Sequence, residues 1–278
     1  MSPSPSPRAS HSHETDIEAH AKGPGLSYNK DATVGSFAMS PELFEKLYLT
    51  PKVPSASQGV KHFANPTPLG LMGFVISTFT FSMILMGWGG ATGFSPVVGI
   101  FFFVGPILLL AGMLFEWIMG NFFTMMSMGL FAVFWLAFGM MQLPTLGLAS
   151  GYSDGATSAP YNTVIALFLI VWGFAFLTFF VFSLKTNVIF AGIFFFAMIA
   201  VWILSGAYFK TASGDYTLAT QLQTAGGALL FVVAILGWYI VVVIMSFEMR
   251  MGINFPLGDL SHLWPSGSAE IGDEEKQK

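Results

Sequence analysis

Long apolar stretches without charged residues recur along the middle of this chain, and short polar connections separate them. Each stretch is long enough, at about 1.5 Å per helical residue, to cross a hydrocarbon layer of roughly 30 Å. Gly, Pro, Asn or charged residues bound every stretch, as is typical of helix ends. We therefore predict an all-α membrane protein whose six transmembrane helices span residues 69–88, 97–115, 122–141, 162–183, 188–208 and 225–245.

The first apolar stretch has a well-defined start. Asn65 can accept a hydrogen bond from a first-turn amide, Pro66 suits the first helical position, and Pro68 lies where no intrahelical amide bond is lost. Phe74 and Thr78, four residues apart, share one face of the predicted helix. We therefore expect this helix to form part of any path through the bundle.

The composition of the chain agrees with a membrane protein. Hydrophobic residues make up 54% of the 278 residues and charged residues 9%, and the mean hydropathy is +0.68, values too apolar for an ordinary soluble domain. The charged residues of the apolar region are Glu116, Asp154, Lys185, Lys210 and Asp215. The net charge of −4 therefore reflects the two tails, and it indicates no nucleic-acid partner.

Lys and Arg indicate the orientation, because cytoplasmic connections are rich in these residues. An even number of spans places both termini on one face, which also carries Lys185 and, near span ends, Lys52, Lys61 and Arg250. Lys210 alone lies on the opposite face. We therefore predict a multi-pass protein of the plasma membrane with both termini in the cytoplasm.

The polar segments outside the spans divide the chain further. Residues 1–38 are rich in Ser, Pro, Gly and His and are expected to be disordered. Residues 39–63 are expected to form a short amphipathic helix and a linker. The transmembrane domain is predicted over 64–246. The cytoplasmic tail 247–278 begins with apolar and turn residues that we expect to fold back onto the membrane face.

Several kinds of chemistry are excluded or disfavoured by the residues present. The absence of cysteine excludes disulfides, thiolate metal sites and cysteine nucleophiles. All the histidines lie outside the predicted spans, which excludes an intramembrane histidine relay. No hydrolase triad, Walker loop, dinucleotide fingerprint or set of metal-spaced ligands occurs in a fitting context. We therefore expect no enzyme, no metal site and no cofactor.

Polar and proline residues inside the spans have two interpretations. Glu116 is a functional candidate as an acid beside a span, but its place at the cytoplasmic edge favours a cap or pore-mouth role over that of a proton carrier. Hydroxyl side chains in membrane helices usually bond to the backbone, although a few, with Thr78, could line a narrow path. Pro106 predicts a kink in the second helix, since its ring removes a backbone hydrogen bond.

Three sequence segments resemble one family. Residues Asn65 to Phe74 read NPTPLGLMGF, which resembles the N-P-x-P-L-G-L signature of the acetate uptake transporter family. Glu116 to Asn121 is similar to the family's E-x-x-x-G-N segment, and 255–261, FPLGDLS, resembles the tail of fungal members. The resemblance runs from residue 64 to about 261 and includes the six-span layout.

The resemblance implies a six-helix protomer that assembles as a homo-hexamer in the lipid bilayer, with a central path for acetate and other small monocarboxylic acids. In the family, a Phe of the first span, a Tyr of the third and a Leu of the fifth form a narrow hydrophobic constriction. The matching positions here are Phe74, Phe131 and Ala197.

Two of these positions depart from the family pattern. Phe131 has no hydroxyl and so cannot hydrogen-bond a solute. Ala197 is smaller than Leu, so the constriction is either wider and less selective or repacked by Met198 or Met128, because methionine adapts to irregular space.

A bare carboxylate would lose much of its hydration free energy in an aromatic constriction. We therefore expect passage as the neutral acid or with a co-transported proton, while Asn65 and the positive end of the first helix hold the carboxylate at the cytoplasmic mouth. Two alternatives stay open. One is ammonia or ammonium export, and the other is a membrane sensor or scaffold that does not transport.

Overall fold

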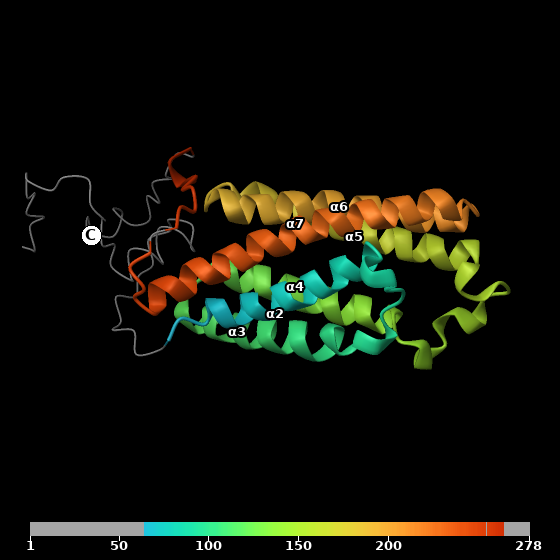
Figure 1. Cartoon of the computed structure of the whole chain (residues 1–278), viewed down its shortest axis with the longest axis horizontal. Coiled ribbons are helices and arrows are strands. Elements are labelled where there is room, and N and C mark those ends of the chain that lie inside the picture. Colours follow the sequence, from blue (N-terminus) through green and yellow to red (C-terminus); the bar gives the residue numbers. More distant parts are fainter. Residues whose placement is uncertain (1–63, 254, 264–278) are drawn as a thin grey trace, which may run out of the picture. The chain divides into compact units, whose positions relative to one another are not determined.

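The computed structural model describes residues 64–253 and 255–263, and within them six helices are long and apolar enough to cross a membrane (Figure 1). The predictions for 1–38, for the amphipathic helix within 39–63 and for the chain after 263 fall outside the described residues. Five of them are α2 (Thr67–Leu85), α4 (Phe122–Met141), α5 (Ala159–Ser183), α6 (Val188–Ala212) and α7 (Tyr216–Glu248). The second span is Ile100–Met119, and α3 (Gly105–Met119) forms most of it.

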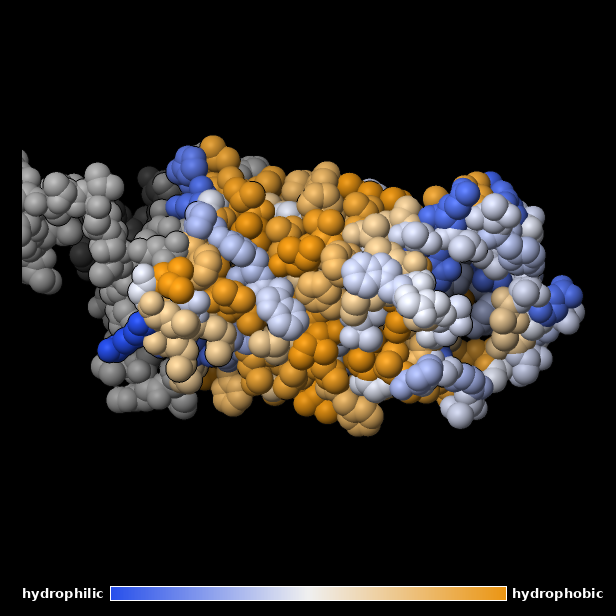
Figure 2. All heavy atoms as spheres, in the orientation of Figure 1, coloured by the Kyte–Doolittle hydropathy of each residue, from blue (hydrophilic) through white to orange (hydrophobic). Residues whose placement is uncertain are grey.

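Large apolar side chains cover the outside of these helices. Phe103, Val171 and Phe182 are among those exposed by more than half of their surface. Figure 2 shows apolar residues over the middle of the helices, between more polar ends. A soluble monomer does not expose apolar surface on this scale, whereas lipid covers it at no cost. The chain is therefore a multi-pass membrane protein.

The helices form a ring with an aromatic interior. Helix α2 packs on α3 and α7, α3 packs on α4, and α6 packs on both α5 and α7. Aromatic rings connect α4 with α5: the centroids of Phe134 and Trp172 are 5.0 Å apart, and those of Phe131 and Phe176 are 5.4 Å apart. Because consecutive helices are antiparallel, the starts of α2, α4 and α6 and the ends of α3, α5 and α7 share one end of the bundle. We call it the Asn65 end.

Side-chain caps mark the starts of α6 and α7. Asn187 accepts a hydrogen bond from the Phe190 amide at 2.9 Å and starts α6 at its predicted residue. Helix α7, expected from 225, begins instead at Tyr216, because Asp215 accepts a hydrogen bond from the Leu218 amide at 3.1 Å. Helix α4 has the predicted bounds. The polar residues that begin α7 concealed its start from a search for apolar runs.

The irregularity predicted around Pro106 is a π-helical turn. Residues Ile100–Val104 form this turn, in which the Gly105 amide bonds to the carbonyl of Ile100, and the regular helix α3 follows from Gly105. Proline has no amide hydrogen and cannot continue the α-helical ladder, so the register changes at this point. The second span therefore starts later than residue 97.

The segment after α7 folds back onto the Asn65 end, as expected for the described part of this tail. The Val188 amide donates to the Gly258 carbonyl at 2.8 Å, and the Tyr239 hydroxyl donates to the Pro256 carbonyl at 2.7 Å. The side chain of Leu257 is buried. This segment therefore covers the turn between α5 and α6.

The tightest helix contact gives a test of the packing. A Cβ atom on Gly173 of α5 would lie 1.8 Å from Nε1 of Trp202 on α6. We expect Gly173→Ala to destabilise the bundle by about 1 to 3 kcal/mol, as overpacking does, and to lower the melting temperature of the purified protein in detergent. Gly206→Ala is the matched control, because its new Cβ would meet Leu222 at an ordinary 3.6 Å. Equal melting temperatures for the two variants would contradict this packing.

Candidate functional site: an aromatic constriction inside the bundle

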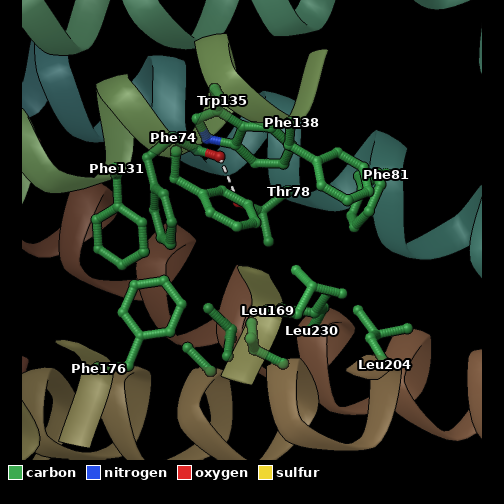
Figure 3. Close-up of a pocket in the computed structure, with 14 residues that line it drawn as sticks. Phe74, Thr78, Phe81, Phe131, Trp135, Phe138, Leu169, Phe176, Leu204 and Leu230 are labelled. Atoms are coloured by element: carbon green, nitrogen blue, oxygen red, sulfur yellow. Dashed lines mark hydrogen bonds between the residues drawn. The ribbon is translucent and has the colours of Figure 1, made fainter. Parts of the chain in front are cut away.

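A small cavity lies inside the ring of helices (Figure 3). Its volume of about 30 Å³ is room for about two water molecules. The described conformation is therefore narrow at this point. The wall is formed by Phe74, Thr78, Phe81, Phe131, Phe134, Trp135, Phe138, Leu169, Phe176, Ala197, Val201, Leu204, Leu230 and Val233.

Four residues predicted to line a path meet in this cavity, although they come from three helices. Phe74 and Thr78 lie on α2, Phe131 on α4 and Ala197 on α6. All four are buried. The ring centroids of Phe74 and Phe131 are 4.4 Å apart, so these two rings contact each other in the wall of the cavity. We call the Phe74, Phe131 and Phe176 rings the aromatic constriction.

Phe176 of α5 was missed in the sequence and takes part in closing the space opposite Phe74. Its ring lies 5.4 Å from that of Phe131, and both belong to the cavity wall. The wall contains neither Met128 nor Met198. Met128 instead packs on Gly70, where a Cβ atom would lie 2.6 Å from its sulfur. Neither methionine therefore borders the cavity next to Ala197.

Most of the missed wall residues follow from helical spacing. Phe81 lies seven residues after Phe74 on α2, Trp135 four after Phe131 on α4, and Leu204 seven after Ala197 on α6. Residues at these spacings share a helix face. Extending each face along its helix from the residue predicted to line a path would have found them.

Hydroxyl side chains in the interior donate hydrogen bonds to backbone carbonyls, which is the usual role of such groups in membrane helices. Thr78 donates to the Phe74 carbonyl at 2.7 Å (Figure 3), Ser127 to the Phe123 carbonyl at 2.8 Å, and Ser205 to the Ala166 carbonyl at 2.8 Å. None of the cavity-wall residues carries a charge. The cavity is therefore an apolar, uncharged segment of the bundle interior.

A hydrogen-bonded cluster closes the Asn65 end of α2 and α3. Glu116 is fully buried, and its carboxylate accepts hydrogen bonds from the Thr67 hydroxyl and, at 2.6 Å, from the Asn121 side chain. Gly120 between them has a φ of 78°, a left-handed conformation that favours glycine and ends α3. The spacing of Glu116, Gly120 and Asn121 therefore makes a helix end whose carboxylate ties α3 to α2.

Asn65, Pro66 and Pro68 lie at the start of α2 and outside the cavity wall. The Asn65 side chain accepts a hydrogen bond from the Thr67 amide at 3.0 Å, as predicted for a first-turn amide. Pro66, expected at the first helical position, is instead the N-cap residue, and the helix begins at Thr67. Its amide nitrogen donates to Glu248 of α7 at 3.1 Å. The candidate residues of the first span thus form two groups. Asn65, Pro66 and Pro68 lie at or just before the start of α2, and Phe74 and Thr78 lie further along it.

A second, larger cavity continues from the constriction to the end opposite Asn65. Its volume is about 230 Å³, and it shares Phe81, Phe138, Leu169 and Leu204 with the first cavity. Polar residues enter its wall there, among them Asn162, Tyr208 and Gln223. The narrow apolar segment and this wider, more polar vestibule therefore lie in series.

Comparison with known proteins identifies relatives of this chain. Protein alcS of Aspergillus fumigatus is 38% identical to the chain over 82% of it and 87% of that relative. Acetate transporter protein patA of Penicillium expansum is 33% identical over 74% of this chain and 82% of the relative. Ammonia transport outward protein 2 of Saccharomyces cerevisiae is 31% identical over 71% of this chain and 67% of the relative.

A solved structure supports the fold. The structure of the bacterial acetate channel SatP covers 70% of this chain and 99% of its own chain, with a TM-score of 0.55 and 22% sequence identity. The model of the GPR1/FUN34/yaaH family matches residues 48–261, a range that includes every span and the segments on which the resemblance was based. The chain belongs to the GPR1/FUN34/yaaH family.

Proposed function

We propose that this protein is a membrane transporter or channel for acetate and other small monocarboxylic acids. The observation that carries the proposal is the pair of cavities in series: a more polar one borders a small, uncharged one that contains the aromatic constriction between α2, α4 and α5. The names of the acetate transporter and acetate channel relatives give the class of solute.

The constriction favours the neutral form of the acid. A carboxylate there would lose its water and would find no positive side chain in the cavity wall, and burying an unpaired charge is far more costly than burying a neutral acid. Phe74 and Phe131 seal the path by apolar contact alone. The solute therefore crosses this point as the undissociated acid or together with a proton.

The start of α2 is the proposed mouth of the path. Asn65 has two amide hydrogens, of which one bonds to Glu248, and Pro66 and Pro68 fix the first turn around it. The N-terminal end of a helix attracts a carboxylate. In this proposal Glu116 supports the mouth by holding Thr67, and Asn65 meets the solute before it reaches the constriction.

The assembly and location are part of the same proposal. We propose a homo-hexamer in the plasma membrane, with the Asn65 end and both termini on the cytoplasmic side. Lys185 and Arg250 lie at the Asn65 end, as expected for a cytoplasmic face. Helix α5 is 28% buried within the single chain, the lowest share of the six helices, so its outer face is available to lipid or to a second copy.

Ammonia or ammonium export is the second candidate, favoured by the similarity to an ammonia transport outward protein. A path for the ammonium ion would need an acid in mid-bundle. Glu116, the fully buried acid among the described residues, lies at the Asn65 end in bonds to Thr67 and Asn121. Acetate therefore ranks above ammonium as the solute. The remaining alternative, a membrane sensor or scaffold, would transport neither acetate nor ammonium.

Uptake of radiolabelled acetate into liposomes that contain the purified full chain tests the function and the form of the solute. We expect uptake above that of protein-free liposomes. At constant total acetate, the rate should fall more than tenfold between external pH 5 and pH 7, because the neutral fraction of an acid with a carboxyl pKa of roughly 4 to 5 falls by more than that. A rate independent of pH would contradict passage as the neutral acid, and no uptake above protein-free liposomes would contradict transport.

The size limit set by the constriction gives a separate prediction. Phe74→Ala removes one ring of the constriction, so the ratio of butyrate to acetate uptake should rise by about tenfold, the effect of one or two accommodated methylene groups. Phe79→Ala is the matched control, because Phe79 lies on the same helix but packs on Phe231 and Trp238, outside the cavity wall. An equal ratio in the two variants would show that Phe74 does not line the path.

A further inference from the structure

One polar atom in the bundle interior is left without a partner. Nε1 of Trp135 is the buried side-chain nitrogen or oxygen without a hydrogen-bond partner among residues 64–253 and 255–263. The residue is 3% exposed and stands in the wall of the narrow cavity, where Figure 3 shows its indole beside Phe138 and Phe74. Buried donors are normally paired, and an exception calls for an explanation.

The other interior donors show how thoroughly this bundle satisfies its polar groups. The Thr78 hydroxyl, which also belongs to the cavity wall, donates to the Phe74 carbonyl. The indole nitrogen of Trp202, on the α5 and α6 contact, donates to the Ile170 carbonyl at 3.3 Å. Trp135 therefore differs from the half-buried Trp202, whose indole nitrogen has a partner. A phenylalanine at position 135 would fill much of the same space without an unpaired donor.

The chemistry of the indole limits what could pair with it. Indole Nε1–H is a donor only, so its partner must present an acceptor, and the rings around it supply none. Ammonium has no acceptor. The carbonyl oxygen of an undissociated carboxylic acid is an acceptor, and it can be brought to this place by a path that excludes the charged form.

We propose that the indole N–H of Trp135 donates a hydrogen bond to the carbonyl oxygen of the carboxylic acid as the solute crosses the aromatic constriction. This inference rests on the proposed function and makes Trp135 a solute-binding residue of the path. It also supplies the recognition that Phe131 cannot give, since Phe131 has no hydroxyl. Trp135 then selects neutral acids over apolar molecules of the same size and over ammonium.

Kinetics of acetate uptake in liposomes provide the first test. Trp135→Phe removes the donor and should raise the KM for acetate about three- to tenfold, the range for one lost hydrogen bond, with a smaller change in maximal rate. The matched control is Trp172→Phe, because Trp172 packs on Phe134 in the same aromatic cluster but does not line the cavity. Its KM should stay near that of the unsubstituted protein.

Nuclear magnetic resonance of the full chain with ¹⁵N-labelled indoles tests the contact directly. The seven tryptophans give seven indole signals, and the signal lost in Trp135→Phe, or in Trp135→Tyr if the first variant does not fold, belongs to Trp135. Acetate at pH 5 should move this signal downfield with a saturable dependence on concentration, whereas sodium chloride at equal ionic strength should not.

The outcomes separate this inference from the function on which it rests. Acetate uptake with an unchanged KM in Trp135→Phe, or an indole signal of Trp135 that acetate does not move, overturns the assignment of Trp135 and leaves transport intact. Absence of acetate uptake by the unsubstituted protein overturns the proposed function itself. A raised KM together with the saturable shift of the Trp135 signal supports both.

Discussion

The need to satisfy polar groups without water governs the interior of this bundle. The hydroxyls of Thr78, Ser127 and Ser205 donate hydrogen bonds to backbone carbonyls. The buried carboxylate of Glu116 lies at a helix end and accepts hydrogen bonds from Thr67 and Asn121. In hydrocarbon an unpaired polar group costs several kcal/mol. The wall of the narrow cavity is aromatic and aliphatic, and we propose that this uncharged surface decides which form of a solute can cross.

Helix α2 joins the two parts of the candidate path. Its start is held to α3 through Thr67 and Glu116 and to α7 through Asn65 and Glu248, while Phe74, two turns further on, stands against Phe131. Anchoring the first turn on two neighbouring helices fixes the height and rotation of the helix. The entrance and the aromatic constriction therefore depend on one rigid element, and a change at the mouth would also move the ring at the constriction.

Local sequence features predicted much of this structure. Apolar length gave the six spans, and the run from Asn65 to Phe74 led to a cavity that also contains Thr78, Phe131 and Ala197. The sequence features did not predict which helices pack against one another. Periodicity shows which residues share a face of one helix but not which faces meet, so the contribution of Phe176 from α5 was missed. The unpaired donor of Trp135 is likewise visible only once its neighbours are in place.

The central claim is that an uncharged aromatic constriction admits the acid only in a form without net charge. The most direct measurement is the electrical current across a planar bilayer that contains the purified protein, under an acetate gradient at fixed pH, with acidification of the receiving side recorded in parallel. The account predicts acidification without an acetate-dependent current, because acid and proton cross together. A steady current that reverses near the acetate equilibrium potential would show that the bare anion passes, and it would contradict the account.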